Sequence, residues 1–298
     1  MEKKIKGVSY GEILWDVFPD KKKIGGAPLN VALRMQALGC DMAMVSAVGN
    51  DEDGQQLVTF LNQHNISIEG VQVKKDFPTG NVTVQLDNKG CASYIINYPV
   101  SWDKIEPSQL NKELVKKADI LVFGSLICRD TISKSTLLEL LSVANFKVFD
   151  VNLRPPHYSY EVLEELMMHS DFIKFNDEEL FEIAEKMGSN KKTIRENILF
   201  IANKTKTKAI CITKGAEGAI LYWDNEFYSS EGYSVNVVDT VGAGDSFLGS
   251  LITKLYQNTH PEEAIDYACA IGALVASKEG ANPVLQDSDV ENLRGIKR

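Results

Sequence analysis

The sequence predicts an α/β fold, in which helices flank a mostly parallel central sheet and a second, small β-sheet lies beside it. Short apolar runs typical of buried strands alternate with helical patterns along most of the 298 residues, which is the rhythm of a parallel sheet covered on both faces. One region, residues 80–98, breaks this rhythm with period-two alternation around the turn sequence Asp-Asn-Lys-Gly at 87–90. A chain of this length can form one large α/β domain or two average domains.

The central sheet is predicted from four apolar runs in the middle of the chain, at residues 120–123, 148–151, 172–175 and 209–212. The helical patterns that alternate with them cover residues 131–144, 159–169, 177–187 and 191–203. Ligands of parallel sheets bind at the carboxyl ends of the strands. The chemically interesting residues expected at such strand ends are Asn152, Arg154, Asn176, Thr213, Gly215 and the segment 239–245.

The small sheet is predicted from apolar residues of one parity in each arm of the hairpin, namely Val82, Val84 and Leu86, then Tyr94, Ile96 and Tyr98. A short stretch near residues 12–18 could add a strand to this hairpin. A sheet with one apolar face must cover something, either a site or the sheet of a partner. The alternative is an ordinary edge hairpin packed on the core.

The most informative segment is the glycine-rich loop Asp-Thr-Val-Gly-Ala-Gly-Asp at 239–245. It follows a β-prone run at 235–238 and opens a helical pattern of apolar residues at 247, 248, 251, 252 and 255. The N-terminus of a helix offers free N–H groups and a positive dipole end to an anion. The carboxylate of Asp245 beside such an anion hole suits phosphoryl transfer to a hydroxyl. The alternative is a common strand–helix turn in which Asp245 is only a cap.

A second candidate loop lies early in the chain, Gly-Gly-Ala-Pro-Leu-Asn at 25–30. Pro28 suits the first turn of a helix, and Gly25 and Gly26 would let the backbone approach a ligand closely. The amide of Asn30 can donate to and accept from a sugar hydroxyl, and Asp16 adds a carboxylate that could bind two neighbouring hydroxyls. The alternative is a simple helix entrance beside a surface acid.

Composition limits the classes of partner. The formal charge of −9 argues against nucleic acid and against an anionic membrane as the main partner. No apolar run approaches the length of a membrane helix, and the Met-Glu-Lys-Lys start is not followed by a signal-like apolar core. Five scattered cysteines without a C-x-x-C pair are typical of a reduced, cytoplasmic protein. The four histidines form no metal-ligand motif.

These motifs together resemble those of the PfkB (ribokinase-like) carbohydrate kinases. The early loop at 25–32 matches one family motif and residues 239–245 match the late signature without a gap. An N-x-x-E motif at 176–179 and a T-x-G segment at 213–215 lie between them, so the resemblance runs from Gly11 to about Pro283. Within the family the chain is most similar to the bacterial fructokinases, on the sequences at 11–16, 123–126 and 150–155. The implied architecture is one ribokinase-like kinase domain over residues 1–298, with lid segments at about 12–24 and 71–102.

The resemblance implies a role for each candidate residue. Asp245 would be the catalytic base, and Gly242, Ala243 and Gly244 the anion hole. Substrate would be held by Asp16, Gly25, Gly26, Asn30 and Asp245. Nucleotide would be bound by Asn176, Thr213, Gly215, Gly218 and Arg154, although Arg154 could instead form a structural salt bridge. Mg²⁺ would be organised, through water, by Asn176 and Glu179, although Glu179 could also be a solvated helix residue.

The resemblance also implies a monovalent cation beside the anion hole, with Asp239 as the acidic position. Val284 stands where some members have a side-chain oxygen, so dependence on K⁺ is left open. The hairpin would be the lid that closes over the sugar and joins two subunits in a homodimer. Tyr94, Tyr98 and Trp102 would stack on the sugar or simply pack.

The resulting hypothesis is an ATP-dependent, Mg²⁺-dependent kinase that converts fructose to fructose 6-phosphate at its primary hydroxyl. Residues 91–102 contain neither Arg nor Lys, which favours a neutral sugar over an acidic one. Ribose, 2-keto-3-deoxygluconate, tagatose and a nucleoside such as adenosine stay open as alternative substrates, because pocket shape decides among them. A sensor that binds sugar or nucleotide without chemistry also stays open. A nicotinamide-dependent oxidoreductase lacks its glycine fingerprint, since Phe247 stands where a third glycine would be needed.

Overall fold

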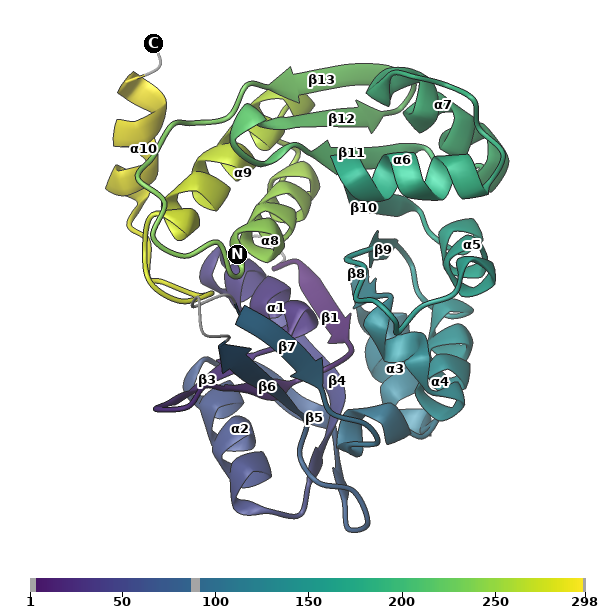
Figure 1. The fold of residues 1–298 in the computed structure, drawn as a ribbon, viewed down its shortest axis with the longest axis vertical. Coiled ribbons are helices and arrows are strands. Elements are labelled where there is room, and N and C mark those ends of the chain that lie inside the picture. The colour runs from purple at the N-terminus through teal and green to yellow at the C-terminus, as the bar shows by residue number, and fades with distance from the viewer. Residues whose placement is uncertain (1–3, 87–91, 297–298) are drawn as a thin grey trace.

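The computed structural model describes residues 4–86 and 92–296, and within them the strands form two separate sheets (Figure 1). The large sheet has the strand order β13-β12-β11-β10-β9-β8-β1-β4-β5. Its strands are β1 (Lys6–Tyr10), β4 (Asp41–Gly49), β5 (Ser67–Lys74), β8 (Ile120–Gly124), β9 (Lys147–Asp150), β10 (Phe172–Asn176), β11 (Ala209–Thr213), β12 (Ala219–Trp223) and β13 (Glu226–Ser230). The pairs from β11 to β5 are parallel, and only β12 and β13 run antiparallel at one edge. The predicted α/β class with a mostly parallel sheet is confirmed.

Helices cover both faces of the large sheet. One face carries α1 (Ala27–Ala37), α2 (Glu52–Gln63), α8 (Ala243–Tyr256), α9 (Pro261–Ala276) and α10 (Asp287–Ile296). The other carries α3 (Gln109–Lys117), α4 (Thr131–Leu141), α5 (Tyr160–Met168), α6 (Asp177–Lys186) and α7 (Ile194–Thr205). Short 3₁₀ turns η1 (Ser101–Lys104), η2 (Leu126–Arg129) and η3 (Gly215–Glu217) complete the described helical elements.

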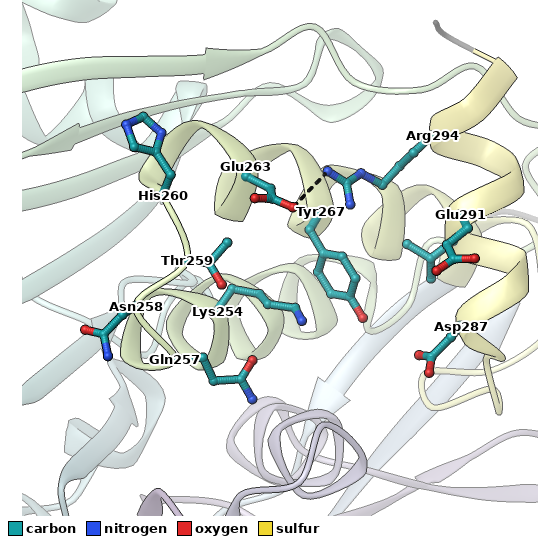
Figure 2. A pocket seen from close by; sticks show the side chains of 11 residues that line it. Lys254, Gln257, Asn258, Thr259, His260, Glu263, Tyr267, Asp287, Glu291 and Arg294 are labelled. Carbon is teal, nitrogen blue, oxygen red and sulfur yellow. Dashed lines mark ion pairs between the residues drawn. The ribbon is translucent and has the colours of Figure 1, made fainter.

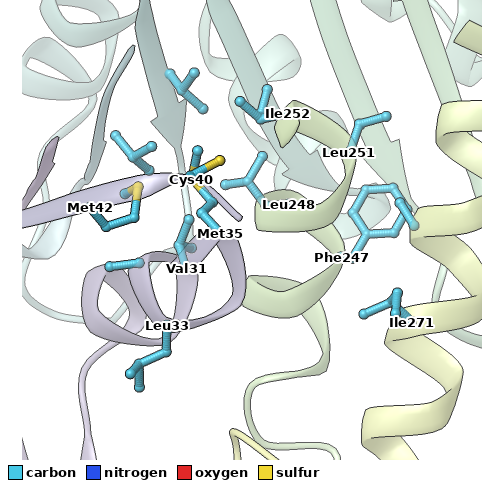
Figure 3. Close-up of a cluster of buried hydrophobic side chains, with 14 of the residues drawn as sticks. Val31, Leu33, Met35, Cys40, Met42, Phe247, Leu248, Leu251, Ile252 and Ile271 are labelled. Atoms are coloured by element: carbon cyan, nitrogen blue, oxygen red, sulfur yellow. The ribbon is translucent and has the colours of Figure 1, made fainter. Parts of the chain in front are cut away.

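The apolar strands supply two cores, because successive residues of a strand point to opposite faces. Val148 belongs to the core under α1 and α8, whereas its neighbour Phe149 belongs to the core under α4 to α7. Figure 3 shows the first of these cores where Leu248 of α8 meets Val31 and Met35 of α1. Burial of these side chains fixes α8 against α1, and with it the start of α8.

The small sheet has the order β3-β2-β6-β7, with β2 (Leu14–Val17), β3 (Lys22–Gly25), β6 (Asn81–Leu86) and β7 (Ala92–Ile96). β2 pairs with β6, so the stretch near 12–18 does join the hairpin as predicted. In Figure 1, β6 and β7 form a dark-blue pair away from the green strands β11 to β13. Residues 71–74, expected in the lid, are the end of β5 in the large sheet. The turn predicted at 87–90 lies outside the described residues, as does the side chain of Tyr94.

One expectation about local structure is wrong, and for Trp102 the packing alternative is the one that the structure has. The run at 235–238 is not a strand, because it has no partner strand, and Val237 and Val238 are 65% and 62% exposed. The N–H groups of Val238 and Asp239 donate instead to the carbonyl of Ala276 at the end of α9. Trp102 is fully buried in the core with α4 and cannot stack on a ligand in this structure.

No helix in the part of the chain that the structure describes has both the length and the apolar character to cross a membrane.

Candidate active site

The candidate residues meet at the carboxyl edge of the parallel strands, opposite the start of α8. Asp245 lies in the first turn of α8 and is partly buried. The Asn30 Nδ2 donates to Asp245 Oδ2 at 2.8 Å, although the two residues are 215 positions apart in the chain. Asn282 Nδ2 in turn donates to Asn30 Oδ1 at 2.6 Å. The two asparagines therefore orient the carboxylate of Asp245 from one side.

The environment of Asp245 raises its pKa to about 6. Burial is the main cause, and the negative charge of Asp150 adds to it, while the Asn30 amide and the cations Lys174 and Arg154 oppose it. A carboxyl with this pKa is mostly ionised at pH 7 and yet more basic than an exposed aspartate. That combination suits a general base that takes a hydroxyl proton near neutral pH.

The first turn of α8 presents free backbone donors beside Asp245. Gly242 is the N-cap with φ 76°, and no side chain caps the turn. A side chain at Gly242 would also meet the Ala281 carbonyl at 2.5 Å. The Ala243 N–H already donates to Thr240 O at 3.3 Å. The predicted donor Ala243 is therefore already used, whereas the N–H groups of Gly242, Gly244 and Asp245 donate to no backbone carbonyl of the described residues and are open to an anion.

The glycine pair before α1 makes room for Asp16. A side chain at Gly25 would collide with Asp16 Oδ2, and a side chain at Gly26, the N-cap of α1 with φ 115°, would collide with the Glu12 carbonyl. Burial raises the pKa of Asp16 to about 6, against the lowering effects of Arg154 and Lys23. The structure therefore sets the carboxylate of Asp16 directly against the loop that leads to Asn30.

Arg154 lies within electrostatic range of three carboxyls of the site. Its positive charge acts on the carboxyls of Asp16, Asp245 and Glu12, lowering the pKa of each against the dominant effect of burial. The hydrogen bond that its guanidinium makes is to the neighbouring carbonyl of Leu153, at 2.9 Å. Among the described residues, no carboxylate lies within 4.0 Å of the Arg154 guanidinium. Arg154 therefore forms no structural salt bridge in this structure.

A buried ion pair lies behind the anion loop. Lys174 and Asp150 are register partners on β10 and β9, and Lys174 Nζ donates to Asp150 Oδ1 at 2.8 Å. The residues are 6% and 4% exposed, and Asp150 Oδ2 has no hydrogen-bond partner. The same ammonium lies 3.7 Å from where a side chain of Gly244 would begin. A fixed positive charge therefore stands next to the free donors of α8.

Asn176 and Glu179 cap the start of α6 reciprocally. Asn176 Oδ1 accepts from the Glu179 N–H at 2.7 Å, and Glu179 Oε2 accepts from the Asn176 N–H at 2.9 Å. Glu179 Oε1 accepts from the Leu153 N–H at 2.8 Å. Glu179 is buried rather than solvated, and burial raises its pKa. Each of these carboxylate oxygens has a further lone pair, so the capping box leaves room for a hydrated cation.

The remaining predicted residues form loops at the ends of β10 to β12. Thr213 ends β11 and its hydroxyl donates to the Phe175 carbonyl at 3.4 Å. Gly215 opens the turn η3, and Gly218 closes it where a side chain would collide with the Ser230 carbonyl. Gly218 is thus required by backbone packing whatever it binds. Asp239 accepts from the Val241 and Gly280 N–H groups at 3.0 and 3.1 Å and lies 4.0 Å from Lys23 Nζ, so it ties the anion loop to the loop after α9.

The sequence prediction missed four residues that the fold brings to this edge, namely Glu12, Asp150, Lys174 and Asn282. Asp150 and Lys174 could have been noticed, because each puts a charge at the end of, or within, an otherwise apolar strand. Glu12 and Asn282 carry no such signal, since each lies in a short polar connection.

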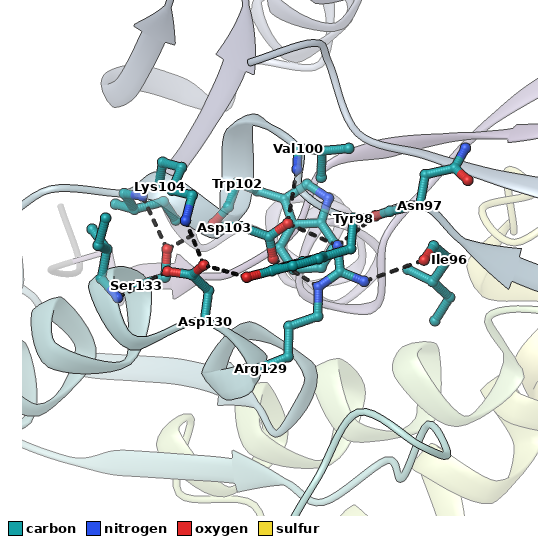
Figure 4. A network of polar contacts seen from close by, with 12 residues as sticks. Ile96, Asn97, Tyr98, Val100, Trp102, Asp103, Lys104, Arg129, Asp130 and Ser133 are labelled. Carbon is teal, nitrogen blue, oxygen red and sulfur yellow. Dashed lines mark hydrogen bonds and ion pairs between the residues drawn. The ribbon is translucent and has the colours of Figure 1, made fainter. Parts of the chain in front are cut away.

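The end of β7 is anchored by Arg129 of η2 (Figure 4). Its guanidinium donates to Asp103 at 2.7 and 2.9 Å and to the Asn97 carbonyl at 2.6 Å. It also lies 3.9 Å from the centre of the Trp102 ring. Tyr98 is 57% exposed and donates to Asp130 at 3.0 Å. The small sheet is therefore fixed at this end, and Trp102 belongs to the anchor.

A pocket of about 510 Å³ lies elsewhere, between α8, α9 and α10 (Figure 2). Lys254, Tyr267 and Arg294 line it together with Glu263 and Asp287. None of the predicted site residues lines it.

Comparison with known proteins shows the family of this chain. The profile of the pfkB family carbohydrate kinases matches residues 3–288. A protein named "Probable fructokinase-2" from Arabidopsis thaliana is 30% identical over 320 residues, covering 97% of this chain and 95% of that protein. A fructokinase-2 from Oryza sativa subsp. japonica is 30% identical over 93% of this chain and 90% of its own length.

Solved structures share the fold. An uncharacterized sugar kinase from Pyrococcus horikoshii has a TM-score of 0.83 at 25% identity, with 98% of each chain covered. The fructokinase from Xylella fastidiosa, solved with bound ATP, has a TM-score of 0.86 at 22% identity, with 98% of each chain covered. The family match spans the loop at 25–30, the N-x-x-E segment and the anion loop at 239–245, so the chain is a carbohydrate kinase and belongs to the pfkB family.

Proposed function

We propose that the protein transfers the γ-phosphate of ATP to the primary hydroxyl of a neutral sugar, with fructose as the acceptor and fructose 6-phosphate as the product. The observation that carries this proposal is the carboxylate of Asp245 beside the free N–H groups of Gly244 and itself, held by Asn30. The curated relatives are named fructokinases. A solved relative from Vibrio cholerae is described with fructose, ADP and potassium ion bound.

In the proposed reaction Asp245 accepts the proton of the sugar hydroxyl as the hydroxyl oxygen attacks the γ-phosphorus. A new O–P bond forms, and the bond between the γ-phosphorus and the bridging oxygen of ADP breaks, so ADP leaves. The N–H groups of Gly244 and Asp245 donate to the phosphoryl oxygens as their charge spreads. Lys174, 3.7 Å from the side-chain position of Gly244, adds a fixed positive charge on the other side of the loop.

The sugar would be bound by Asp16, Asn30 and Asp245, together with the loop at Gly25 and Gly26. Asp16 and Asn30 offer acceptors and a donor for hydroxyls, and Gly25 and Gly26 keep the backbone out of their way. Arg154 would contact a phosphate of the nucleotide, because a guanidinium can pair bidentately with phosphate oxygens. Its positive charge also acts on Asp16 and Asp245.

The nucleotide would lie along Thr213, Gly215 and Gly218 at the ends of β11 and β12. Asn176 and Glu179 fit a hydrated Mg²⁺, because the carboxylate oxygens of Glu179 keep a further lone pair beside their capping contacts. When bound, Mg²⁺ supplies charge neutralisation on the phosphates and usually keeps several waters, so a sparse protein shell is expected. A monovalent cation would lie near Asp239, whose two oxygens each accept one backbone N–H group and keep a further lone pair.

We further propose that the small sheet β3-β2-β6-β7 is a lid and that two such lids pair in a homodimer. Support comes from its separation from the large sheet and from the apolar parity of its strands. Closure of such a lid would exclude water, so that ATP is not simply hydrolysed. Light scattering of the purified protein would show twice the monomer mass if the lids pair.

The test is ADP release from Mg·ATP against a panel of fructose, ribose, 2-keto-3-deoxygluconate and adenosine. Turnover on fructose above the rest of the panel would support the proposal. Turnover on another acceptor would keep the kinase and refute fructose. Binding of sugar and ATP without ADP formation would favour a sensor.

A further inference from the structure

Four buried polar atoms without a partner gather at the carboxyl edge of the large sheet. Glu12 follows β1, Ser125 follows β8, Asp150 ends β9, and Asn282 lies in the loop that reaches Asn30. β9, β8 and β1 are neighbours in the sheet. Buried polar groups in folded proteins are nearly always hydrogen-bonded. Such a concentration at one edge therefore indicates acceptors and donors that a ligand completes.

Glu12 is the most costly of these groups. It is 5% exposed, and its Oε2 accepts no hydrogen bond from the described residues. A buried carboxyl oxygen that lacks a hydrogen-bond donor is destabilising. Burial raises the pKa of Glu12 to about 7, and Asp245 adds to the rise, while the backbone N–H of Glu12 itself, Arg154 and Arg129 oppose it. Since Arg129 is already paired with Asp103, it does not compensate Glu12 directly.

The position of Glu12 ties it to the sugar-binding loop. Its carbonyl lies so close to Gly26 that a side chain there would collide with it, and Pro28 of α1 packs against the preceding Gly11. Gly26 is the N-cap of α1, the helix that carries Asn30. The backbone of Glu12 is therefore in contact with the start of the sugar-binding loop. Its carboxyl lies within electrostatic range of Asp245 on α8 and of Arg154 after β9.

We propose that Glu12 binds the substrate, and that its Oε2 accepts a hydrogen bond from a sugar hydroxyl other than the one that is phosphorylated. This proposal rests on the proposed sugar kinase activity and deepens it. A hydroxyl supplies the missing donor, and Arg154 balances the charge. A substrate with its own carboxylate in this position would face Glu12 and Asp16 together, so the pair selects for a neutral polyol ring or chain.

The test uses Glu12→Gln, which keeps the size of the side chain, and Glu113→Gln on the exposed face of α3 as a matched control. A hydrogen bond to a charged group is worth about 1.5–3 kcal/mol, which is a roughly 10- to 150-fold change. We expect the KM for the sugar to rise by about that factor in Glu12→Gln, with the KM for ATP changed less than about twofold. The control should match the wild type.

A series of deoxy analogues of the accepted sugar separates binding from a structural role. For the wild type, kcat/KM for one deoxy analogue should be about tenfold or more below that for the parent sugar. For Glu12→Gln, kcat/KM for the same analogue and for the parent sugar should be nearly equal. Equal discrimination of every analogue by the wild type and the variant would overturn the proposal. Glu12→Asp, which keeps the charge and shortens the side chain, should lose the same discrimination, and failure of both variants to fold would also overturn it.

The same experiment separates this proposal from the proposed function. If the wild type phosphorylates a sugar and Glu12→Gln discriminates as the wild type does, only the role of Glu12 fails. If the wild type phosphorylates no sugar, the kinase proposal fails and the role of Glu12 fails with it.

Discussion

Replacement of Lys174 by Met should change two properties that depend on its buried pair with Asp150. These are the free energy of unfolding and the pKa of Asp245. The pair has an N–O distance of 2.8 Å and almost no solvent exposure. Removing the ammonium leaves the carboxylate of Asp150 buried with both oxygens unpartnered. Breaking a buried ion pair in this way costs about 3–5 kcal/mol. We therefore expect the free energy of unfolding to fall by about that amount at pH 8.

The same change should move the pH dependence of turnover. Lys174 lowers the pKa of Asp245 and Asp150 raises it. In Lys174→Met the lowering effect of Lys174 is lost while the raising effect of Asp150 stays, so the acid limb of kcat/KM should move upward from about pH 6. The variant should then lose more activity at pH 6 than at pH 8, in addition to a loss at every pH from the missing charge beside Gly244.

Urea unfolding at pH 8 and a pH–rate profile measure the two effects. The double variant Lys174→Met with Asp150→Asn is the control, because it removes the orphaned charge. It should recover part of the stability, and its acid limb should return toward that of the wild type. A loss of stability below about 1 kcal/mol in the single variant, or an unmoved acid limb, would exclude this role of Lys174.

Three further predictions concern the sugar side of the site. Asp16→Asn should raise the KM for the sugar by about 10- to 100-fold and leave the KM for ATP nearly unchanged, as initial-rate kinetics would show; a change confined to the KM for ATP would contradict this placement. Gly25→Ala should do the same by displacing Asp16, because its new methyl collides with the carboxylate, whereas Gly295→Ala, with nothing within 4 Å, should be neutral; equal kinetics of the two alanine variants would exclude the collision. Glu12→Gln should stabilise the ligand-free protein at pH 8 but not at pH 4, because a carboxyl whose folded pKa is about 7, above its ordinary 4.5, costs stability as pH rises through that interval. The gain at pH 8 has an upper limit of about 3 kcal/mol at 1.36 kcal/mol per pH unit, and a loss in thermal unfolding at pH 8 would contradict it.

Much of the fold could be predicted because strand and helix periodicities were strong and local. The runs at 120–123, 172–175 and 209–212 are strands of the large sheet, and α6 begins where Asn176 caps it. The run at 235–238 was misassigned, since valines favour strands only where a partner strand is available. Sequence does not show that the segment instead hydrogen-bonds to the end of α9.

The candidate site could be predicted only in part. The glycine loops and Asp245 are marked by local motifs, and the structure brings Asn30 to Asp245. The Lys174–Asp150 pair depends on the register of β9 against β10. The missing hydrogen-bond partner of Glu12 Oε2 depends on which side chains the folded chain packs around it. Such tertiary properties have no period or spacing along the chain.

The proposed proton transfer from the sugar hydroxyl to Asp245 is tested by Asp245→Asn. The variant keeps the shape of the side chain beside Asn30 but cannot accept the proton as a carboxylate does. We predict that ADP release with fructose falls by about 10²–10⁴-fold while ATP still binds with near wild-type affinity in calorimetry. A turnover within tenfold of the wild type, with ATP binding intact, would exclude Asp245 as the base.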